Sequence, residues 1–330
     1  MTDARFLQTL QKTRCILPPL TGYTDYPYRV ILSSFHPGFI TTEMVHTSPV
    51  VRRNRRTMQM LRRTDGGHLN GAQLLGRDPP EMVAAAKLLV NEGFDFIDVN
   101  MGCTSPKVTR RGEGVALMLD EQHAANLVSA LVQTIDVPVT VKIRLGPTPT
   151  LQNYLSLALR LQEAGATAIT IHGRTGDHKT SPSVNHSCIA QAVSALSIPV
   201  IANGGVSSGK VARAVVKKTG CAGIMPGRFL IGNPWLVQEI QAALEGNLYH
   251  PPGFEERRDV CRQHFGHLTE MYGPWGAAIR LRSIFSHYFP KIKNRAAFNK
   301  DVHLMDYSQF LHLLDAIEDS PWESQRIIIG

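Results

Sequence analysis

The sequence has no stretch of about 20 apolar residues, the length that a helix needs to cross a bilayer. Its first residues, Met1–Arg5, lack a basic segment followed by an apolar run, so no secretory signal is predicted. Its five cysteines are widely separated, and none lies in a CxxC pattern. Neither a disulfide framework nor a metal site is therefore expected. These absences favour a protein of the reducing cytoplasm without a membrane or a metal partner.

Composition and charge describe a folded protein with a basic surface. The chain has 330 residues, of which 43% are hydrophobic and 19% are charged, which is typical of a globular protein with a sizeable core. Lys and Arg total 35 against 27 Asp and Glu, giving a formal net charge of +8. This excess favours a polyanionic partner.

Eight short runs rich in β-branched residues alternate with amphipathic stretches, as in repeated βα units. The runs are Cys15–Pro18, Phe39–Thr42, Ala72–Leu75, Phe94–Asn100, Val139–Arg144, Ala168–His172, Val200–Asn203 and Gly223–Met225. Helices are expected between most of them, over Glu81–Asn91, Gln122–Thr134, Leu151–Glu163 and Ser207–Lys218. The pattern predicts an α/β fold, a closed (β/α)8 TIM barrel. A doubly wound sheet is disfavoured, because the first run meets Pro18-Pro19-Leu20-Thr21-Gly22 and not a G-x-G-x-x-G turn.

The alternating pattern stops at Glu245–Gly253, which has the composition of a linker. The remaining sequence has helical periodicity and no clear strand. The expected division is a barrel over residues 1–245 and a small all-α helical bundle over residues 246–330.

Polar residues gather at the predicted carboxyl ends of the strands, where barrel enzymes place their active sites. They are Glu43, Gln73, Asn100, Lys142, Arg144, His172 and Asn203. The loops after the seventh and eighth runs, Asn203-Gly204-Gly205 and Pro226-Gly227-Arg228, match the position at which many barrels bind phosphate. Glycines let the backbone approach an oxyanion closely, and an arginine adds a charge-assisted contact.

Cys103 directly follows the fourth run, in Asn100-Met101-Gly102-Cys103-Thr104. A cysteine thiol is ordinarily protonated at neutral pH, so at this rim it can deliver a proton. No histidine adjoins it in the sequence, which makes nucleophilic catalysis the weaker interpretation. The other four cysteines are expected to be small buried hydrophobic residues.

Six motifs occur in order over residues 15–240, and together they resemble those of the tRNA-dihydrouridine synthases. They are Pro18-Pro19-Leu20-Thr21-Gly22-Tyr23-Thr24-Asp25, Asn100-Met101-Gly102-Cys103, Val141-Lys142-Ile143-Arg144, Ile171-His172-Gly173-Arg174-Thr175, Ala202-Asn203-Gly204-Gly205 and Gly227-Arg228. A barrel followed by a helical bundle is also that family's arrangement. The resemblance implies an FMN enzyme that reduces the C5–C6 bond of specific uridines in tRNA, with NADPH reducing the flavin again.

The resemblance also implies roles for individual residues. Lys142 and Gln73 would hold the polar edge of the flavin ring, above a floor formed by Pro18, Pro19 and Leu20. His172, Asn203, Gly204, Gly205, Gly227 and Arg228 would serve its phosphate end. Hydride would pass from flavin N5 to uracil C6, and Cys103 would protonate C5. Contacts to the RNA substrate are expected from Glu43, Asn100, Arg144 and Arg174 at the rim and from Arg280, Arg282, Lys291 and Lys293 in the bundle. We expect a monomer.

Several positions depart from the family pattern. Thr104 replaces the usual proline after the cysteine, and residues 177–186 replace the usual elements after Thr175. Two other interpretations stay open, and these departures bear on the second of them. One is an FMN enzyme of the dihydroorotate or dihydropyrimidine dehydrogenase type, acting on free bases. The other is a barrel that has lost catalysis and only binds RNA.

Overall fold

The computed structural model describes residues 2–177, 183–289, 300–303 and 305–317. Eight parallel strands form one sheet in these residues: β1 (Phe39–Thr41), β2 (Val45–His46), β3 (Leu69–Leu75), β4 (Phe96–Met101), β5 (Val139–Arg144), β6 (Ala168–His172), β7 (Val200–Asn203) and β8 (Gly223–Met225). The sheet order is β1-β3-β4-β5-β6-β7-β8, and β2 extends the pairing of β1 along β3. The predicted (β/α)8 class is confirmed.

Two single bridges close the barrel where the first strand was expected. Cys15 pairs with Ile224 of β8, and Ile16 pairs with Phe39 of β1, both in parallel. The ladder goes no further because Pro18 and Pro19 have no backbone N–H to donate. The predicted strand Cys15–Pro18 is therefore reduced to two bridging residues, but it occupies its expected place in the barrel.

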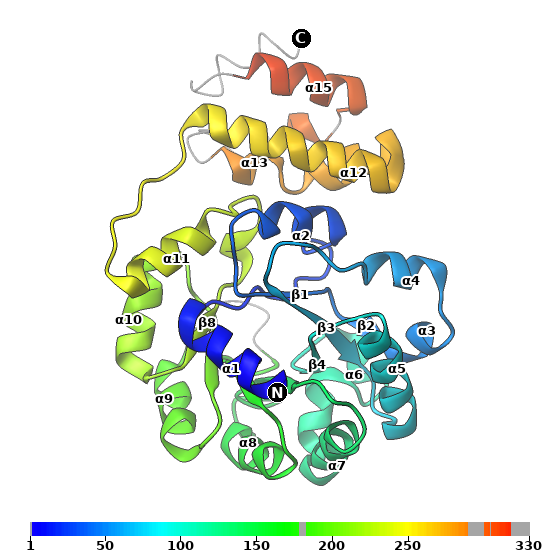
Figure 1. The fold of residues 1–330 in the computed structure, drawn as a ribbon, viewed down its shortest axis with the longest axis vertical. Helices are drawn as coiled ribbons and strands as arrows, with labels where there is room; N and C mark the ends of the chain where they lie inside the picture. Colours follow the sequence, from blue (N-terminus) through cyan, green and yellow to red (C-terminus); the bar gives the residue numbers. More distant parts are fainter. Residues whose placement is uncertain (1, 178–182, 290–299, 304, 318–330) are drawn as a thin grey trace.

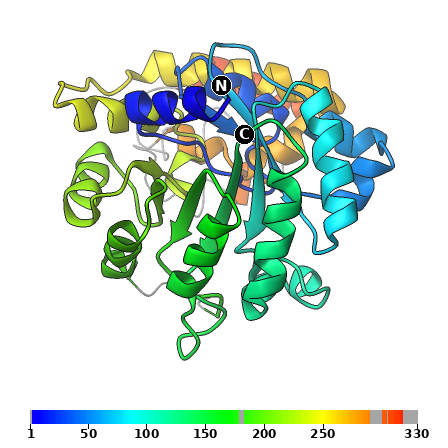
Figure 2. The ribbon, with the colours of Figure 1, turned by 60° about the horizontal axis from the view of Figure 1, so that its bottom comes forward.

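The helices α5 (Pro79–Asn91), α7 (Glu121–Val132), α8 (Tyr154–Glu163), α9 (His186–Ala195), α10 (Gly209–Thr219) and α11 (Leu236–Glu245) surround the strands (Figures 1 and 2). Shorter helices α3 (Thr47–Val51), α4 (Arg55–Met60) and α6 (Pro106–Thr109) lie in the loops. Side-chain caps fix several starts: Asp78 accepts from the amide of Glu81, and Ser208 accepts from that of Val211.

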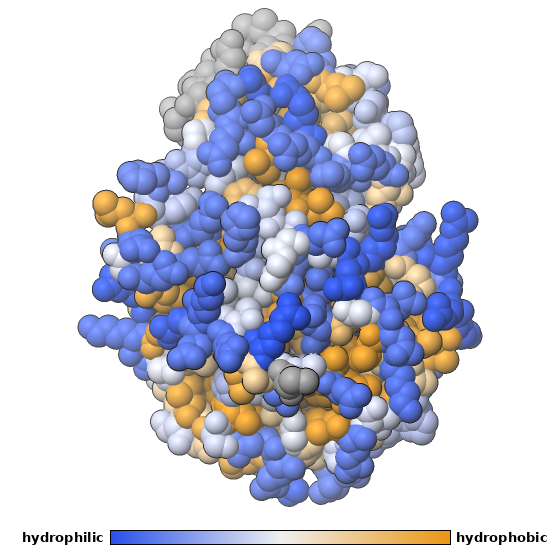
Figure 3. All heavy atoms as spheres, viewed as in Figure 1, coloured by the Kyte–Doolittle hydropathy of each residue, from blue (hydrophilic) through white to orange (hydrophobic). Residues whose placement is uncertain are grey.

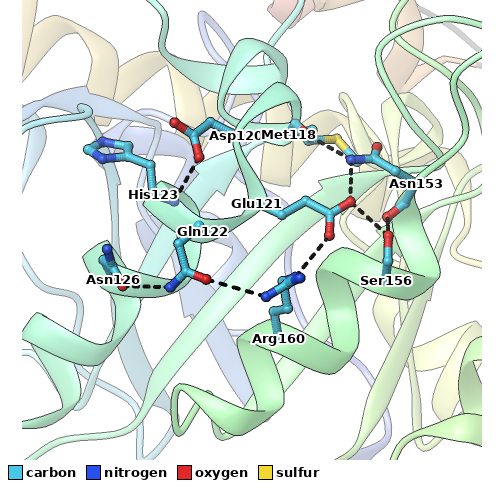
Figure 4. A network of polar contacts seen from close by, with 9 residues as sticks. All are labelled: Met118, Asp120, Glu121, Gln122, His123, Asn126, Asn153, Ser156 and Arg160. Carbon is cyan, nitrogen blue, oxygen red and sulfur yellow. Dashed lines mark hydrogen bonds and ion pairs between the residues drawn. The ribbon is translucent and has the colours of Figure 1, made fainter.

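A polar network joins neighbouring outer helices α7 and α8 (Figure 4). The Glu121 carboxylate accepts from Asn153 Nδ2 at 2.9 Å and from Ser156 Oγ at 2.7 Å, and it pairs with Arg160 at 3.3 Å. Asn153 also donates to the carbonyl of Met118 at 2.6 Å. The network lies on the outside of the barrel, so we assign it a structural role.

The helix α1 (Thr2–Thr13), which the periodicity analysis missed, covers the amino-terminal end of the barrel (Figure 1). Its Phe6 ring packs against Phe39 at 4.8 Å and Phe96 at 5.4 Å between ring centroids. An aromatic layer therefore seals this end, and the opposite end is left for a site. Figure 3 shows the face that carries α1, which is mostly hydrophilic.

The carboxyl-terminal helices stack above the barrel and are called the helical part here (described residues of 254–317). They are α12 (Phe254–Arg282), α13 (Phe285–Tyr288) and α15 (Tyr307–Ala316). The helix α2 (Tyr26–Ser33) of the barrel lies between the strands and α12 (Figure 1). Gly273, with φ 70° and ψ 170°, and Pro274 kink α12. No helix or strand spans residues 247–253, where the linker was predicted.

No helix among the described residues is both long and apolar enough to cross a membrane. Within the same ranges, no group of three or more His, Cys, Asp or Glu side chains is arranged to hold a metal ion.

Candidate active site

Alternation along the strands divides the barrel interior into layers. On β4, Phe96, Asp98 and Asn100 share one face, and Ile97 and Val99 pack outward against the helices. Phe96 belongs to the aromatic end, Asp98 to the middle and Asn100 to the carboxyl rim. The rim is therefore the polar layer that the sequence predicts.

Strand register brings the predicted rim residues side by side. Asn100 pairs with Lys142 between β4 and β5, and Arg144 pairs with His172 between β5 and β6. His172 in turn pairs with Asn203 of β7. One continuous arc of the mouth is thus lined by amide, cationic and imidazole side chains.

A chain of hydrogen bonds runs from the middle layer to the rim. The Asp98 carboxylate accepts from Thr140 Oγ1 and from Gln73 Nε2, both at 2.6 Å. The Gln73 carbonyl oxygen accepts from Asn100 Nδ2 at 2.8 Å. Because an ionised carboxylate can only accept, Asp98 faces the Nε2 end of the Gln73 amide, and the Gln73 carbonyl oxygen faces Asn100. That oxygen in turn accepts from Asn100 Nδ2, so Asn100 Oδ1 faces the loop beyond. We call Asp98, Gln73 and Asn100 the amide relay.

The relay ends at the loop that carries Cys103. Asn100 Oδ1 accepts from the amide of Gly102 at 3.1 Å and from that of Cys103 at 2.9 Å. On the other side of the loop, the carbonyl of Cys103 accepts from the amide of Val115 at 2.9 Å. The backbone of Cys103 is therefore held on both sides, and its side chain is half-exposed at the rim.

Arg144 ties the same loop to the next one. Its Nε donates to the carbonyl of Gly102 at 2.7 Å and its Nη1 to that of Thr175 at 3.0 Å. Arg144 therefore supports two rim loops in addition to contributing positive charge.

Burial and like charges perturb the ionisable groups of the rim. Burial first, and then repulsion from Arg144, lowers the pKa of Lys142 to about 8. Burial, followed by the charges of Lys142, Arg144, Arg174 and Arg228, lowers the pKa of His172 to about 2. Arg174 Nη1 lies 3.2 Å from His172 Nε2, and since a guanidinium can only donate, this nitrogen accepts and the ring is neutral. Burial raises the pKa of Asp98 to about 6. Four cations around a neutral ring form a site for an anion.

The two glycine loops leave backbone space beside these cations. Gly204 and Gly205 have φ of 115° and 72°, values that L-residues rarely adopt. A Cβ on Gly204 would lie 2.9 Å from the His172 ring, and one on Gly227 would meet no heavy atom within 4 Å. Asn203 Nδ2 donates to the carbonyl of Met225 at 2.9 Å and so joins the two loops. This cradle fits a phosphate group beside a cationic rim.

Other predicted residues lie in the loop after the bridges. Pro18 is buried, and Pro19 and Leu20 are half-buried. Glu43 is buried, and its carboxylate accepts from the backbone amide of Gly22. Glu43 therefore holds the loop that carries Pro18, Pro19 and Leu20.

The predicted RNA-binding cations of the helical part have different surroundings. Arg280 pairs with Asp25 of the barrel, and Arg282 donates to the carbonyl of Met305 inside the helical part at 2.8 Å. Lys291 and Lys293 lie outside the described residues. RNA contacts from these four residues stay predictions.

An open cavity of about 560 Å³ lies where the barrel meets the helical part. It is lined by Tyr23, Arg228, Phe229, Ile231, Asn233, Arg257 and His287. The exposed Phe229 and the two arginines give this cavity aromatic and cationic walls.

A family model described as Dihydrouridine synthase (Dus) matches residues 16–319. The chain belongs to the dihydrouridine synthase family. Among its relatives, the tRNA-dihydrouridine synthase B of Yersinia pestis is 35% identical over 313 residues, covering 93% of this chain and 96% of the relative. That of Klebsiella pneumoniae is 34% identical over 311 residues, covering 94% and 93%. A FabK mutant structure from Thermotoga maritima aligns with a TM-score of 0.45 and 15% identity, covering 70% and 66% of the two chains.

Two buried charges of this dihydrouridine synthase family member, Asp98 and Arg29, are not among the residues predicted from the sequence. A carboxylate between Ile97 and Val99 of a predicted strand is nevertheless a usable signal for Asp98. Arg29 is buried in α2, where it donates to the carbonyls of Thr24, Met60 and Arg62. No feature of the sequence around Arg29 shows that its partners are backbone carbonyls, two of which, those of Met60 and Arg62, lie 31 and 33 residues along the chain.

Proposed function

We propose that this chain reduces the C5–C6 double bond of specific uridines in tRNA to 5,6-dihydrouridine, with FMN as its bound cofactor and NADPH as the reductant. The relatives named tRNA-dihydrouridine synthase B support the substrate. The observation that carries the proposal is the barrel mouth. There the half-exposed Cys103 lies on a braced loop beside Lys142 and the glycine cradle of Gly204, Gly205 and Gly227.

The residues of the mouth fit FMN. The glycine cradle, with Arg174 and Arg228, suits the phosphate, because it combines backbone space with positive charge. Lys142 and Gln73 would hold the polar edge of the ring; the charge of Lys142 favours electron-rich oxygens there. When bound, FMN supplies the hydride that is added to C6 of the uracil.

Cys103 would provide the matching proton. Its thiol S–H bond breaks as a C–H bond forms at uracil C5, so that C5 gains a proton while C6 gains a hydride. The brace from Asn100 and Val115 fixes the backbone of Cys103 without using its thiol. The side chain of Asn100 would also help to position the uracil.

Several features support RNA over a free base as substrate. The net charge is +8, and the cavity beside the mouth has cationic and aromatic walls that suit phosphates and unstacked bases. We assign residues 1–245 to the catalytic barrel and residues 246–330 to a tRNA-binding bundle. A target uridine must leave its stack to reach the mouth, at a cost of a few kcal/mol.

The test replaces Cys103 with Ala, with Cys188→Ala as the matched control, since Cys188 is also half-exposed but lies on α9. We expect Cys103→Ala to keep the absorbance of bound FMN and to lose dihydrouridine formation on an unmodified tRNA transcript. Cys188→Ala should keep both properties. Full activity in Cys103→Ala would refute the role of the thiol, and turnover of free uracil or orotate in place of the transcript would refute the RNA substrate.

A further inference from the structure

Arg280 reaches across the junction between the helical part and the barrel. Its Nη1 lies 3.5 Å from Asp25 Oδ2, and the side chains of Arg280 and Asp25 are 31% and 5% exposed. The guanidinium carbon also lies 3.8 Å from the ring centroid of Tyr272, and the Tyr272 hydroxyl is close enough to Asp25 to act on the pKa of that carboxyl group. Arg280 and Tyr272 of α12 thus converge on one buried carboxylate of the barrel.

The kink in α12 makes this convergence possible. On a straight helix, residues eight positions apart are separated by about 12 Å along the axis, which is more than an arginine side chain bridges. The left-handed backbone at Gly273 redirects α12 between Tyr272 and Arg280 and lets the cation lie on the ring. The contact follows from a local feature of the sequence, Gly273-Pro274.

Asp25 is also the last residue of the loop that carries Pro18 and Pro19. Its Oδ1 accepts from the amide of Tyr28 at 3.1 Å and caps α2. Within the same loop, Gly22 donates its amide to Glu43, and the amide of Leu20 donates to Thr24 Oγ1 at 2.8 Å. The loop is therefore held at its middle by Glu43 and at its end by Asp25.

The two carboxyl groups depend on nearby cations. Glu43 is buried near Asp25, and the positive charges of Arg29 and Arg280 act on both groups. A buried carboxylate that loses its cation is strongly destabilised. Removing Arg280 should therefore affect the loop of residues 18–25 in the barrel.

We propose that Arg280 is a positioning residue that, together with Tyr272, fastens the helical part to Asp25 and so holds the loop of residues 18–25 in place. This role differs from the RNA contact that is expected of Arg280 from the sequence. The consequence for flavin binding rests on the proposed function, because the loop would form the floor under FMN.

The experiment compares Arg280→Met with Arg262→Met in the full chain. Arg262 is a cation of the same helix whose carboxylate partners, Asp259 and Asp315, both belong to the helical part. The first readout is hydrogen exchange of the amides of residues 20–25, which needs no ligand. We expect exchange to accelerate about tenfold or more in Arg280→Met and to stay at the wild-type rate in Arg262→Met.

Two further readouts distinguish the contact of Arg280 with Asp25, called the clamp from here on, from a contact of Arg280 with RNA. The affinity for added FMN should fall in Arg280→Met, and the slope of log affinity for tRNA transcript against log salt should stay unchanged. A lost phosphate contact would instead lower that slope by about one. Wild-type exchange in the loop of Arg280→Met would overturn the proposal. If the wild-type protein binds no FMN, the proposed function fails, and the exchange result still decides the clamp.

Two other variants cover the case in which Arg280→Met does not fold. Asp25→Asn removes the charge and keeps a good helix cap, because Asn caps as well as Asp does. Tyr272→Phe removes only the hydroxyl. Each of these two variants should accelerate hydrogen exchange of the amides of residues 20–25. Asp25→Asn combined with Arg280→Met should be no worse than the more severe single variant, since both break one interaction. Additive effects would overturn the proposal.

Discussion

The amide relay predicts a stability defect that depends on pH and can be reversed by a second substitution. Replacing Gln73 with Glu puts a carboxyl oxygen where Gln73 Nε2 now lies, 2.6 Å from Asp98 Oδ2. Two ionised carboxylates at about 3 Å would repel each other by about 5 kcal/mol at an effective dielectric constant of 20. The folded variant should avoid this repulsion by keeping one proton between the two groups, as carboxylate pairs do.

The size of the defect follows from that proton. The pKa of Asp98 in the wild-type protein is raised to about 6, so above pH 6.5 its carboxylate is largely ionised in both the folded and the unfolded states. Folded Gln73→Glu then holds one proton more than its unfolded chain. A group whose pKa is raised by folding loses its stability contribution as the pH rises, here by about 1.4 kcal/mol per pH unit. From pH 6.5 to pH 8.0 the variant should lose about 2 kcal/mol relative to the wild-type protein.

Adding Asp98→Asn should remove this pH dependence. Thr140 can still donate to Asn at position 98, whose amide can donate to Glu at position 73, and Asn100 can donate to the second oxygen of that Glu. The site again has one carboxylate, with a partner for every donor. Urea unfolding midpoints of the wild type, Gln73→Glu and the double variant across this pH range provide the measurement. A defect of constant size, or a double variant less stable than Gln73→Glu at pH 8.0, would refute the hydrogen-bond pattern described for the relay.

Four other substitutions test single features of the structure. Gly204→Ala should reduce FMN affinity at least tenfold, measured by fluorescence titration, because its Cβ would lie 2.9 Å from the His172 ring at a φ of 115°. Arg144→Lys should lower the free energy of unfolding by about 1–2 kcal/mol, seen in urea unfolding, because one ammonium cannot serve two loop carbonyls. Gly273→Ala should lower the free energy of unfolding by about 1–3 kcal/mol in the same assay, because φ 70° and ψ 170° lie in a region that essentially only glycine adopts, although no neighbouring atom opposes the methyl group. His172→Asn should reduce the loss of stability on acidification below pH 6.5 by up to about 1.4 kcal/mol per pH unit, because the pKa of His172 is lowered to about 2 and unfolding takes up a proton there.

The architecture could be predicted because the strands of a barrel are short, buried and separated by helices of similar length. The strands β5, β6, β7 and β8 have the predicted bounds. β3 begins at Leu69, earlier than predicted, because Asn70 and Gly71 interrupt the apolar pattern although both are buried. Pairing with a neighbour strand extends an element beyond what its own composition indicates.

The missed helices have weak local signals. The helix α1 has mostly polar residues, and its inward face is reduced to Phe6 and Leu10, which are four positions apart. It is stabilised by the aromatic layer at the end of the barrel, which is made by residues far away in the sequence. The helix α9 begins after the cap residue Asn185, whose side chain accepts from two backbone amides. Asn185 lies within residues 177–186, which depart from the family pattern and give no clear helix signal.

The candidate site could be predicted as a set of residues but not as a set of contacts. Strand ends converge at one rim in any barrel, so the positions of Gln73, Asn100, Lys142 and His172 follow from the fold. Their partners do not, because each is chosen by register and by side-chain orientation between strands. Asp98 shows the difference. Its strand is predicted, but the hydrogen bonds that connect Asp98 through Gln73 to Asn100 depend on how the side chains of β3 and β4 pack against one another.

Arg280 shows why a basic stretch of sequence has to be considered together with the partner of each of its cations. Its stretch, residues 280–300, contains basic residues and no acidic ones, and such a pattern indicates contact with a polyanion. The compensating acid is Asp25, which lies at the other end of the sequence and is buried under α12. A cation that already acts on a buried carboxylate is a poor phosphate ligand, because transferring it to RNA would remove one of the two cations, Arg280 and Arg29, that stabilise that carboxylate. The partner of each cation in a basic stretch should therefore be identified before the stretch is assigned to RNA. In this chain the partner of Arg280 is Asp25 of the barrel, which is the basis of the junction role proposed above.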